Sequence, residues 1–204
     1  MKSPGVILAG GLSRRMGQSK AMTLLCGRSL LQHVADILLP QVALLGVNSN
    51  DPQLVTTLPV IADQIPGFVG PLAGIAAAMG FARQMKPGAS HVLIAPVDTP
   101  FLPANLAERL KRGVDSVDSV VLAASGGRVH PVIGLWPLSL QAEIENWLDK
   151  PENRKLMVFL ERCSVQNVIF PDVETKNGPR DPFFNINTPE DRQKAEDAMK
   201  ALYP

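Results

Sequence analysis

The sequence has little of several things that would point to particular classes of partner. Only 5% of its residues are aromatic, and 20 lysine and arginine residues balance 19 aspartate and glutamate residues, for a formal charge of +1. A protein that coats nucleic acid needs an excess of positive charge and aromatic platforms for stacked bases. Binding to a membrane surface through basic residues needs a similar excess. We therefore expect neither a nucleic-acid partner nor a membrane partner.

Cysteine and long apolar runs are scarce as well. Cys26 and Cys163 are the only two cysteines. They fit no metal-ligand spacing and suggest no disulfide framework, as is usual in a reducing cytosol. No apolar stretch approaches the roughly 18 residues that a membrane helix needs, and the N-terminus lacks the charged-then-apolar pattern of a secretory signal. These absences predict a cytoplasmic protein.

Short apolar runs alternate with patterns of helical spacing along all 204 residues. This alternation is typical of a three-layer, Rossmann-like α/β fold, in which strands are buried on both faces. We therefore predict a single domain over 1–204, with a mostly parallel sheet and helices on both faces. The predicted strands lie at 5–10, 42–47, 58–63, 91–97, 119–124, 128–136 and 165–170. The predicted helices lie at 29–41, 71–85, 103–113, 138–149, 154–161 and 188–202.

Several residues predict where these helices begin and end. Ser29 and Thr188 are in positions typical of N-caps, and Pro71 is in a favoured first-turn position. Gly113 follows the last periodic residue of its helix, as a stop signal does. The segment 171–182 has no periodic pattern, and we predict that it is the loosest part of the chain.

The first predicted strand ends in two glycines, and three positive charges follow in the stretch VILAGGLSRRMGQSK. Gly10 and Gly11 allow the backbone to approach a ligand closely, and the N–H groups of such loops bind anions. Arg14, Arg15 and Lys20 supply charge for a polyphosphate. The stretch has neither the dinucleotide pattern G-x-G-x-x-G nor the P-loop, in which lysine directly follows a glycine. It predicts a nucleotide loop of another kind, and a solvated glycine loop is the alternative.

Asp98, in the stretch APVDTPFL, lies just past the end of the clearest buried strand. In open α/β sheets, ligands bind beyond the carboxyl ends of the strands. A carboxylate at this place can hold Mg²⁺, which prefers oxygen ligands and keeps several waters. Asp-Thr-Pro is also a common turn sequence in which the aspartate caps the turn. The residues alone leave both interpretations open.

Motifs spread over nearly the whole chain resemble those of one family. The pattern LAGG-S-RMG-K is similar to the signature of nucleotidyltransferases that join a nucleotide to an acceptor phosphate and release pyrophosphate. Further motifs follow in the same order as in the MobA family, the molybdenum cofactor guanylyltransferases. They are HVADILLPQ, VNSN, GPLAG, VDTP, HPVIGL, MVF and NINTPED. One departure is Ser19, which stands where the family often has an aspartate before the loop lysine. We assign Ser19 no catalytic role.

The resemblance implies a fold like that of the nucleotide-diphospho-sugar transferases, with GTP as substrate and Mg²⁺ as cofactor. It implies transfer of GMP to the terminal phosphate of molybdopterin carrying molybdenum, which gives the guanine dinucleotide cofactor and pyrophosphate. Other molybdenum cofactor biosynthesis proteins and chaperones of the apoenzymes are then expected as partners. The alternatives are cytidylyl transfer to the same pterin, nucleotidyl transfer to another small phosphate, and a non-catalytic nucleotide or cofactor carrier. The presence of Lys20 and Asp98 speaks against the carrier.

The resemblance also assigns roles to residues. It implies that Lys20, Asp98 and Arg15 are catalytic, with Asp98 as the metal ligand. The residues that it assigns to the nucleotide are Leu8, Ala9, Gly10, Gly11, Lys20, Asn48, Asp63, Gly70, Pro71, Leu72 and Asp98. Those assigned to the acceptor are Asn185, Asn187, Arg154 and His130.

Several of these residues have a structural alternative. Asn48 is of a type frequent in turns, GPLAG also suits tight helix-to-sheet packing, and a lone histidine such as His130 is more often structural. Asn185 and Asn187 alternate along an extended segment, so they face the same side. Cytidylyl members of the family carry alanine at the position of Gly10. We expect a methyl group there to narrow the space for a purine, or to remove a backbone geometry that glycine adopts easily.

Overall fold

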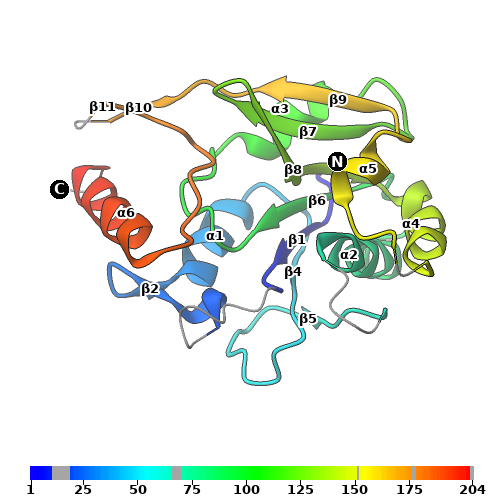
Figure 1. Cartoon of the computed structure of the whole chain (residues 1–204), viewed down its shortest axis with the longest axis horizontal. Coiled ribbons are helices and arrows are strands. Elements are labelled where there is room, and N and C mark those ends of the chain that lie inside the picture. The colour runs from blue at the N-terminus through cyan, green and yellow to red at the C-terminus, as the bar shows by residue number, and fades with distance from the viewer. Residues whose placement is uncertain (11–18, 66–69, 151, 176–177, 203–204) are drawn as a thin grey trace.

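The computed structural model describes residues 1–10, 19–65, 70–150, 152–175 and 178–202 (Figure 1). A seven-stranded sheet of order β5-β4-β1-β6-β8-β7-β9 runs through its centre. Neighbouring strands are parallel except at β8, which is antiparallel to both β6 and β7. The predicted mostly parallel sheet is confirmed. Its strands are β1 (Gly5–Leu8), β4 (Leu45–Asn48), β5 (Val60–Ile61), β6 (His91–Pro96), β7 (Val120–Ser125), β8 (Arg128–Pro137) and β9 (Val165–Ile169).

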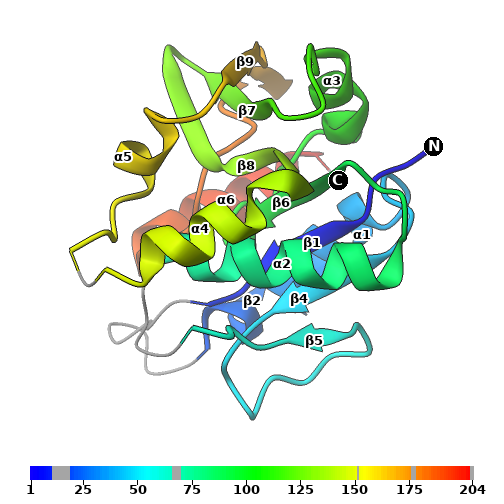
Figure 2. The same ribbon diagram turned by 90° about the vertical axis from the view of Figure 1, so that its right-hand side faces the viewer.

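Helices cover both faces of this sheet, and Figure 2 shows α2 and α4 in front of the strands with α1 behind them. The three-layer, Rossmann-like arrangement is therefore confirmed. One face carries α1 (Leu30–Leu38), α3 (Leu106–Arg112) and α6 (Pro189–Leu202), and the other carries α2 (Pro71–Met85), α4 (Gln141–Leu148) and α5 (Leu156–Leu160). Short 3₁₀ turns lie at η1 (Lys20–Met22) and η2 (Leu138–Leu140). Within the ranges that the structure describes, no helix has both the length and the apolar character to cross a membrane.

The sheet separates two hydrophobic cores. In β1, Val6 and Leu8 pack in the core under α2, whereas Ile7 between them packs in the core with α1 and α3. Side chains of successive strand residues point to opposite faces, so a strand that is apolar throughout fills both cores. Full burial of one such side chain stabilises the fold by about 1.5–3 kcal/mol. The apolar runs of the sequence are thus the inner layer of the molecule.

Capping bonds confirm two predicted helix starts. Ser29 Oγ accepts a hydrogen bond from the N–H of Gln32 at 3.2 Å, and the N–H of Ser29 donates to Gln32 Oε1 at 3.0 Å. This reciprocal pair is a capping box, which satisfies two backbone N–H groups at the start of α1. Thr188 Oγ1 accepts from the N–H of Asp191 at 3.1 Å and caps α6 in the same way.

The structure contains two short hairpins that the sequence patterns do not predict. These are formed by β2 (Leu24–Leu25) with β3 (Arg28–Ser29), and by β10 (Val173–Thr175) with β11 (Gly178–Arg180). The first turns at Cys26 and Gly27, which have φ of 48° and 79°. The second lies within 171–182, where the sequence predicts the loosest segment. Strands of two or three residues are too short to show an alternating pattern, so their pairing is visible only in the fold.

Candidate active site

The carboxyl ends of three neighbouring strands form one edge of the sheet. Leu8 at the end of β1 is in register with Asn48 of β4 on one side and with Pro96 of β6 on the other. Hydrogen bonds from the N–H of Ala9 to Asn48 O at 2.9 Å and from the N–H of Val97 to Leu8 O at 3.0 Å continue this pairing. The residues that follow each strand therefore lie side by side, where open α/β sheets bind their ligands.

Lys20, Asp98 and Asn187 meet at this edge. Lys20 Nζ donates to Asp98 Oδ2 at 2.6 Å and to Asn187 Oδ1 at 2.6 Å. Lys20 opens η1, Asp98 follows β6, and Asn187 comes shortly before α6. The Lys20 and Asp98 side chains are only 23% and 16% exposed. Three segments far apart in the sequence thus place a cation, a carboxylate and a carboxamide together in a site that is partly shielded from water.

Asp98 has one oxygen atom that the described residues do not satisfy. Its Oδ1 is buried and accepts no hydrogen bond from the residues that the structure describes. A buried carboxylate oxygen without a donor is costly unless a ligand uses it. Among the same residues, no three histidine, cysteine, aspartate or glutamate side chains gather to hold a metal. Mg²⁺ is often held by one or two carboxylates together with phosphate oxygens and waters. Asp98 therefore fits a Mg²⁺ ion that takes most of its ligands from a substrate and from water.

A second polar cluster lies beside β4 and β5. Asn48 Nδ2 donates to Ile61 O at 3.1 Å and to Asp63 Oδ1 at 2.8 Å. Asp63 Oδ2 accepts from Asn50 Nδ2 at 2.8 Å, and Asn50 Oδ1 accepts from the N–H of Asp63 at 2.8 Å. Both protons of the Asn48 amide are thus committed within the protein, and the Asn48 Oδ1 atom is the part that can accept from a ligand. Asn50, the last residue of the VNSN motif, also belongs to this cluster.

The space around Asn48 depends on a glycine in α2. A Cβ atom at Gly74 would lie 2.5 Å from Asn48 Oδ1, which is closer than such atoms approach in proteins. A Cβ atom at Gly10 would lie 3.7 Å from the same oxygen, which is an ordinary contact. The φ angle of Gly10 is also outside the left-handed region that favours glycine. The backbone explanation for glycine at this position is therefore wrong, and the steric explanation stays a prediction.

The other described residues assigned to a nucleotide offer mainly backbone groups. Leu8 and Ala9 are buried at the end of β1, and Leu72 is fully buried in the core under α2. Gly70 is the N-cap of α2 with φ of 80°, and Pro71 is the first residue of that helix. A helix N-terminus favours anions through its free N–H groups. Two of the residues assigned to the loop, Gly11 and Arg15, lie outside the described residues, and so does Arg14.

Two of the residues assigned to an acceptor lie on the segment that carries Asn187. Asn185 and Asn187 are exposed, and Ile186 between them is buried. The two asparagines therefore share one side of the segment, as their alternation predicts. The N–H of Ile186 donates to Asp98 O at 2.9 Å. This bond fastens the segment to the end of β6, next to the predicted metal ligand.

The other two residues assigned to an acceptor bond to neighbouring parts of the protein. Arg154 Nη1 donates to Leu148 O at 2.9 Å and to Lys150 O at 3.4 Å, at the end of α4. His130 Nε2 lies 2.8 Å from Ser125 Oγ, across the β7–β8 pair. These bonds direct both side chains toward other segments of the chain, so their direct contact with an acceptor stays a prediction.

A model of the MobA-like NTP transferase domain matches residues 5–165. The chain belongs to this family. The molybdenum cofactor guanylyltransferase of Rhizobium meliloti (strain 1021) is 50% identical over 196 residues, which cover 95% of this chain and 90% of that protein. A protein of the same name from Sinorhizobium fredii (strain NBRC 101917 / NGR234) is 46% identical over 204 residues, with 98% and 94% covered. The crystal structure of molybdopterin-guanine dinucleotide biosynthesis protein A from Archaeoglobus fulgidus has a TM-score of 0.73 at 26% identity, covering 97% of this chain and 98% of that chain.

Membership of the family makes the chain an enzyme of the nucleotidyltransferase class. The matched region contains Lys20, Asp98 and the cluster around Asn48, but it ends before Asn187. The bond between Lys20 and Asn187 therefore joins the family domain to the part of the chain beyond it.

Proposed function

We propose that the chain transfers GMP from GTP to the terminal phosphate of molybdopterin carrying molybdenum, forming the guanine dinucleotide cofactor and pyrophosphate. The relatives named molybdenum cofactor guanylyltransferase support this reaction. The observation that carries the proposal is the meeting of Lys20, Asp98 and Asn187 beyond the strand ends. This arrangement suits a reaction between two phosphates, because it offers a positive charge, a metal-binding oxygen and a polar group from a separate segment.

The reaction needs no nucleophile from the protein. An oxygen of the acceptor phosphate attacks the α-phosphorus of GTP in line. The bond from that phosphorus to the bridging oxygen of the β-phosphate breaks, and pyrophosphate leaves with the electron pair. Catalysis consists of holding both substrates in line and offsetting negative charge. We assign the offsetting charge to Lys20 and to Arg15 of the glycine loop.

Asp98 would hold Mg²⁺ through Oδ1, which accepts no bond from the described residues, and the ion would supply positive charge to the phosphate oxygens. The other oxygen, Oδ2, accepts from Lys20 Nζ. The two oxygens of one carboxylate thus have different partners, and the bond to Lys20 fixes the rotation of the Asp98 side chain. This division of roles supports Asp98 as the metal ligand and Lys20 as the neighbouring group that contacts the phosphates.

We assign the nucleotide to the edge formed by β1, β4 and the start of α2. Among residues 8–10 and 70–72, Gly10, Gly70 and Leu72 can offer backbone N–H groups to the nucleotide, because the N–H of Ala9 already donates to Asn48 O and Pro71 has none. Asn48 Oδ1 offers an acceptor, and Asp63 holds the Asn48 carboxamide in position. We assign the phosphates to the glycine-rich loop and to Lys20.

We assign the acceptor to the side of the site that Asn185 and Asn187 line. Both are exposed, and Asn187 is already bonded to Lys20. Arg154 and His130 stay in the proposal as further acceptor contacts. We also propose that residues 1–204 work as one domain in the cytoplasm. Other molybdenum cofactor biosynthesis proteins and apoenzyme chaperones would then exchange substrate and product with it.

The test is GTP turnover with and without molybdopterin, with the product identified by mass spectrometry. We expect a guanine dinucleotide and one pyrophosphate per turnover, both dependent on the pterin. Turnover with CTP in place of GTP would favour cytidylyl transfer. Nucleotide binding without release of pyrophosphate would instead favour a carrier.

Gly74→Ala is expected to raise KM for GTP by about tenfold. The new Cβ atom would lie 2.5 Å from Asn48 Oδ1 and 3.2 Å from Asn48 Cγ, so it would push the carboxamide from its place. The matched control is Gly80→Ala in the same helix, where a Cβ atom meets only Gln141 Nε2, at 3.4 Å. Steady-state kinetics of both variants measure the effect. Equal KM values for the two would remove Asn48 from the nucleotide site.

Gly10→Ala is expected to lower kcat/KM for GTP by about tenfold and to lower it less for CTP. Among the described residues, a Cβ atom at Gly10 meets none closer than Asn48 Oδ1 at 3.7 Å, so this part of the protein accommodates it. The loss would therefore come from the bound nucleotide, and the larger base has less room. The measurement is kcat/KM for both nucleotides in both proteins, with melting temperature as the check on folding.

Two results would contradict this interpretation of Gly10. An unchanged ratio between GTP and CTP would mean that base choice lies elsewhere, with Asn48 and Asp63 next to test. A wild type that prefers CTP would exclude guanylyl transfer and support only the assignment to the nucleotidyltransferase class. The reason is that a pocket built for guanine leaves its own polar groups without partners when cytosine binds.

A further inference from the structure

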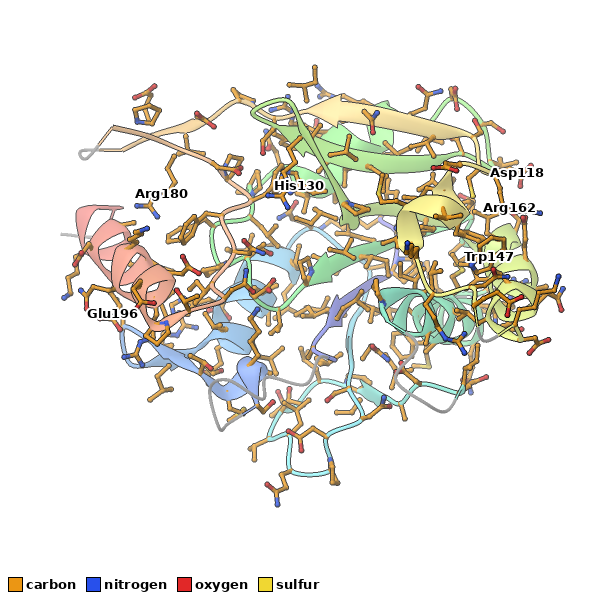
Figure 3. All side chains as sticks on the ribbon, in the orientation of Figure 1. Asp118, His130, Trp147, Arg162, Arg180 and Glu196 are labelled. Carbon is orange, nitrogen blue, oxygen red and sulfur yellow. The ribbon has the colours of Figure 1, made fainter. Side chains whose placement is uncertain are left out.

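Ser125, His130 and Asp181 form a chain of hydrogen bonds. Ser125 Oγ lies 2.8 Å from His130 Nε2 and 2.7 Å from Asp181 Oδ1. Ser125 ends β7, His130 lies in β8, and Asp181 begins the segment that leads to α6. Figure 3 shows His130 between the β7–β8 pair and that segment. Ser125 is only 2% exposed, and His130 and Asp181 are half-buried, so these bonds form a partly buried junction between the sheet and the segment.

The direction of each bond follows from the groups themselves. A carboxylate only accepts, so the Ser125 hydroxyl donates to Asp181 Oδ1. The hydroxyl has a single proton, so it accepts from the N–H at His130 Nε2. Burial lowers the pKa of His130 below its ordinary value, which keeps the ring neutral near pH 7. In a hydrolytic triad the serine proton passes to the histidine. Here it points to the aspartate, so Ser125 is not an activated nucleophile.

Asp181 holds the start of the segment in a defined turn. Asp181 Oδ1 also accepts from the N–H of Phe183 at 2.9 Å, and Asp181 O accepts from the N–H of Phe184 at 3.1 Å. The Phe183 ring packs against the His130 ring with centroids 4.7 Å apart, and against the Phe170 ring at 5.2 Å. The same histidine therefore supports the segment twice, through Ser125 and through a ring contact.

The other end of the segment reaches the site. Ile186 is bonded to the backbone of Asp98, and Asn187 accepts from the lysine of η1. Only four residues separate Asp181 from Ile186. Because the segment is so short and Phe183 within it is buried, a shift at Asp181 is passed on to the exposed asparagines next to the site.

We propose that Ser125, His130 and Asp181 are positioning residues that hold segment 182–187 in place for the acceptor. The inference rests on the proposed function, because that segment carries the two asparagines assigned to the acceptor. This role is exerted through the segment, and it does not require that any of the three residues contacts the substrate itself. The nucleotide side built on β1, β4 and α2 lies outside the segment. Lys20 and Asp98 do bond to the segment, but we assign them to the transition state and the metal, so we expect GTP binding to change little.

Steady-state kinetics with GTP and molybdopterin test this division. Ser125→Ala and His130→Ala are expected to raise KM for molybdopterin by about tenfold and to leave KM for GTP within about twofold. His130→Gln, whose carboxamide can donate to Ser125 Oγ, is expected to recover most of the loss. The matched control is Ser139→Ala, because Ser139 Oγ donates to Asp118 Oδ1 at the same 2.7 Å. Figure 3 shows Asp118 far from His130, and we expect no change in either KM.

The outcomes separate this inference from the proposed function. A wild type that forms no guanine dinucleotide would overturn the proposed function and, with it, this inference. With an active wild type, an unchanged KM for molybdopterin in Ser125→Ala would overturn the positioning role alone. An equal rise in KM for GTP and KM for molybdopterin would also overturn it. So would a loss of activity that accompanies a lower melting temperature and that His130→Gln does not recover. A selective rise with rescue would support it.

Discussion

Asp98→Asn is expected to lower kcat by about 10²–10³-fold while the protein stays folded. Asparagine has nearly the same size, and its oxygen can accept from Lys20 Nζ where Asp98 Oδ2 does now. Its amide group then takes the place of Oδ1, the buried oxygen that has no donor among the described residues. An amide N–H₂ group donates and does not bind a hard cation. We therefore expect the loss to come from metal binding, with the hydrogen bond to Lys20 preserved.

The measurement is kcat at saturating GTP over a range of Mg²⁺ concentrations, together with the melting temperature. Asp115→Asn is the matched control, because Asp115 Oδ2 also accepts a side-chain bond at 2.6 Å, from Gln166 Nε2, at an exposed position. We expect this control to keep wild-type turnover. Near wild-type activity of Asp98→Asn at saturating Mg²⁺ would end the metal assignment.

Lys20→Ala is expected to lower kcat by about 10²-fold and to change KM for GTP much less. Negative charge shifts onto the departing pyrophosphate in the transition state, so a cation that acts there affects the rate more than the binding of GTP. Lys20 Nζ already has two acceptors in place, Asp98 Oδ2 and Asn187 Oδ1, each at 2.6 Å. The cation is therefore held in position before the substrates arrive, and removing it costs this preorganisation as well.

Single-turnover and steady-state rates of Lys20→Ala separate chemistry from binding. Lys111→Ala is the matched control, because Lys111 Nζ donates to Met1 O at 3.1 Å, away from the strand ends that form the site. An increase in KM with unchanged kcat would make Lys20 a plain binding residue. The charge on the pyrophosphate would then have to be offset by other groups.

The sequence predicts the layers of the fold better than the order of the strands. Apolar runs such as 91–97 predict strands that are buried on both faces, because successive side chains point alternately into the two cores. Strands joined by a short turn, as β7 and β8 are after Ser125, are antiparallel neighbours. The glycines of this turn, Gly126 and Gly127, have φ of 53° and 76°. The pairing of β8 with β6 is not predictable in this way, because the paired residues are about 40 positions apart in the sequence. The buried strands are all apolar, so their composition does not show which strand lies beside which.

The site shows the same limit at the level of single residues. Lys20 and Asp98 stand out in the sequence because charged residues follow apolar runs there. Their contact with Asn187 is not visible in any spacing, since it depends on where a late segment crosses the sheet edge. Ser125 and Asp181 are ordinary turn residues by type, and only their shared hydrogen bond shows that they belong together.

The contact between Lys20 and Asn187 joins residues 167 positions apart. At the ribosome's pace of about 5–20 residues per second, Asn187 is made roughly 10–30 s after Lys20. A growing chain thus exposes its glycine loop, Lys20 and Asp98 long before the segment assigned to the acceptor exists. On the proposed assignment, the residues of the nucleotide edge are therefore made before any residue of the acceptor side. The complete site can form only after the segment through Asn187 has been made.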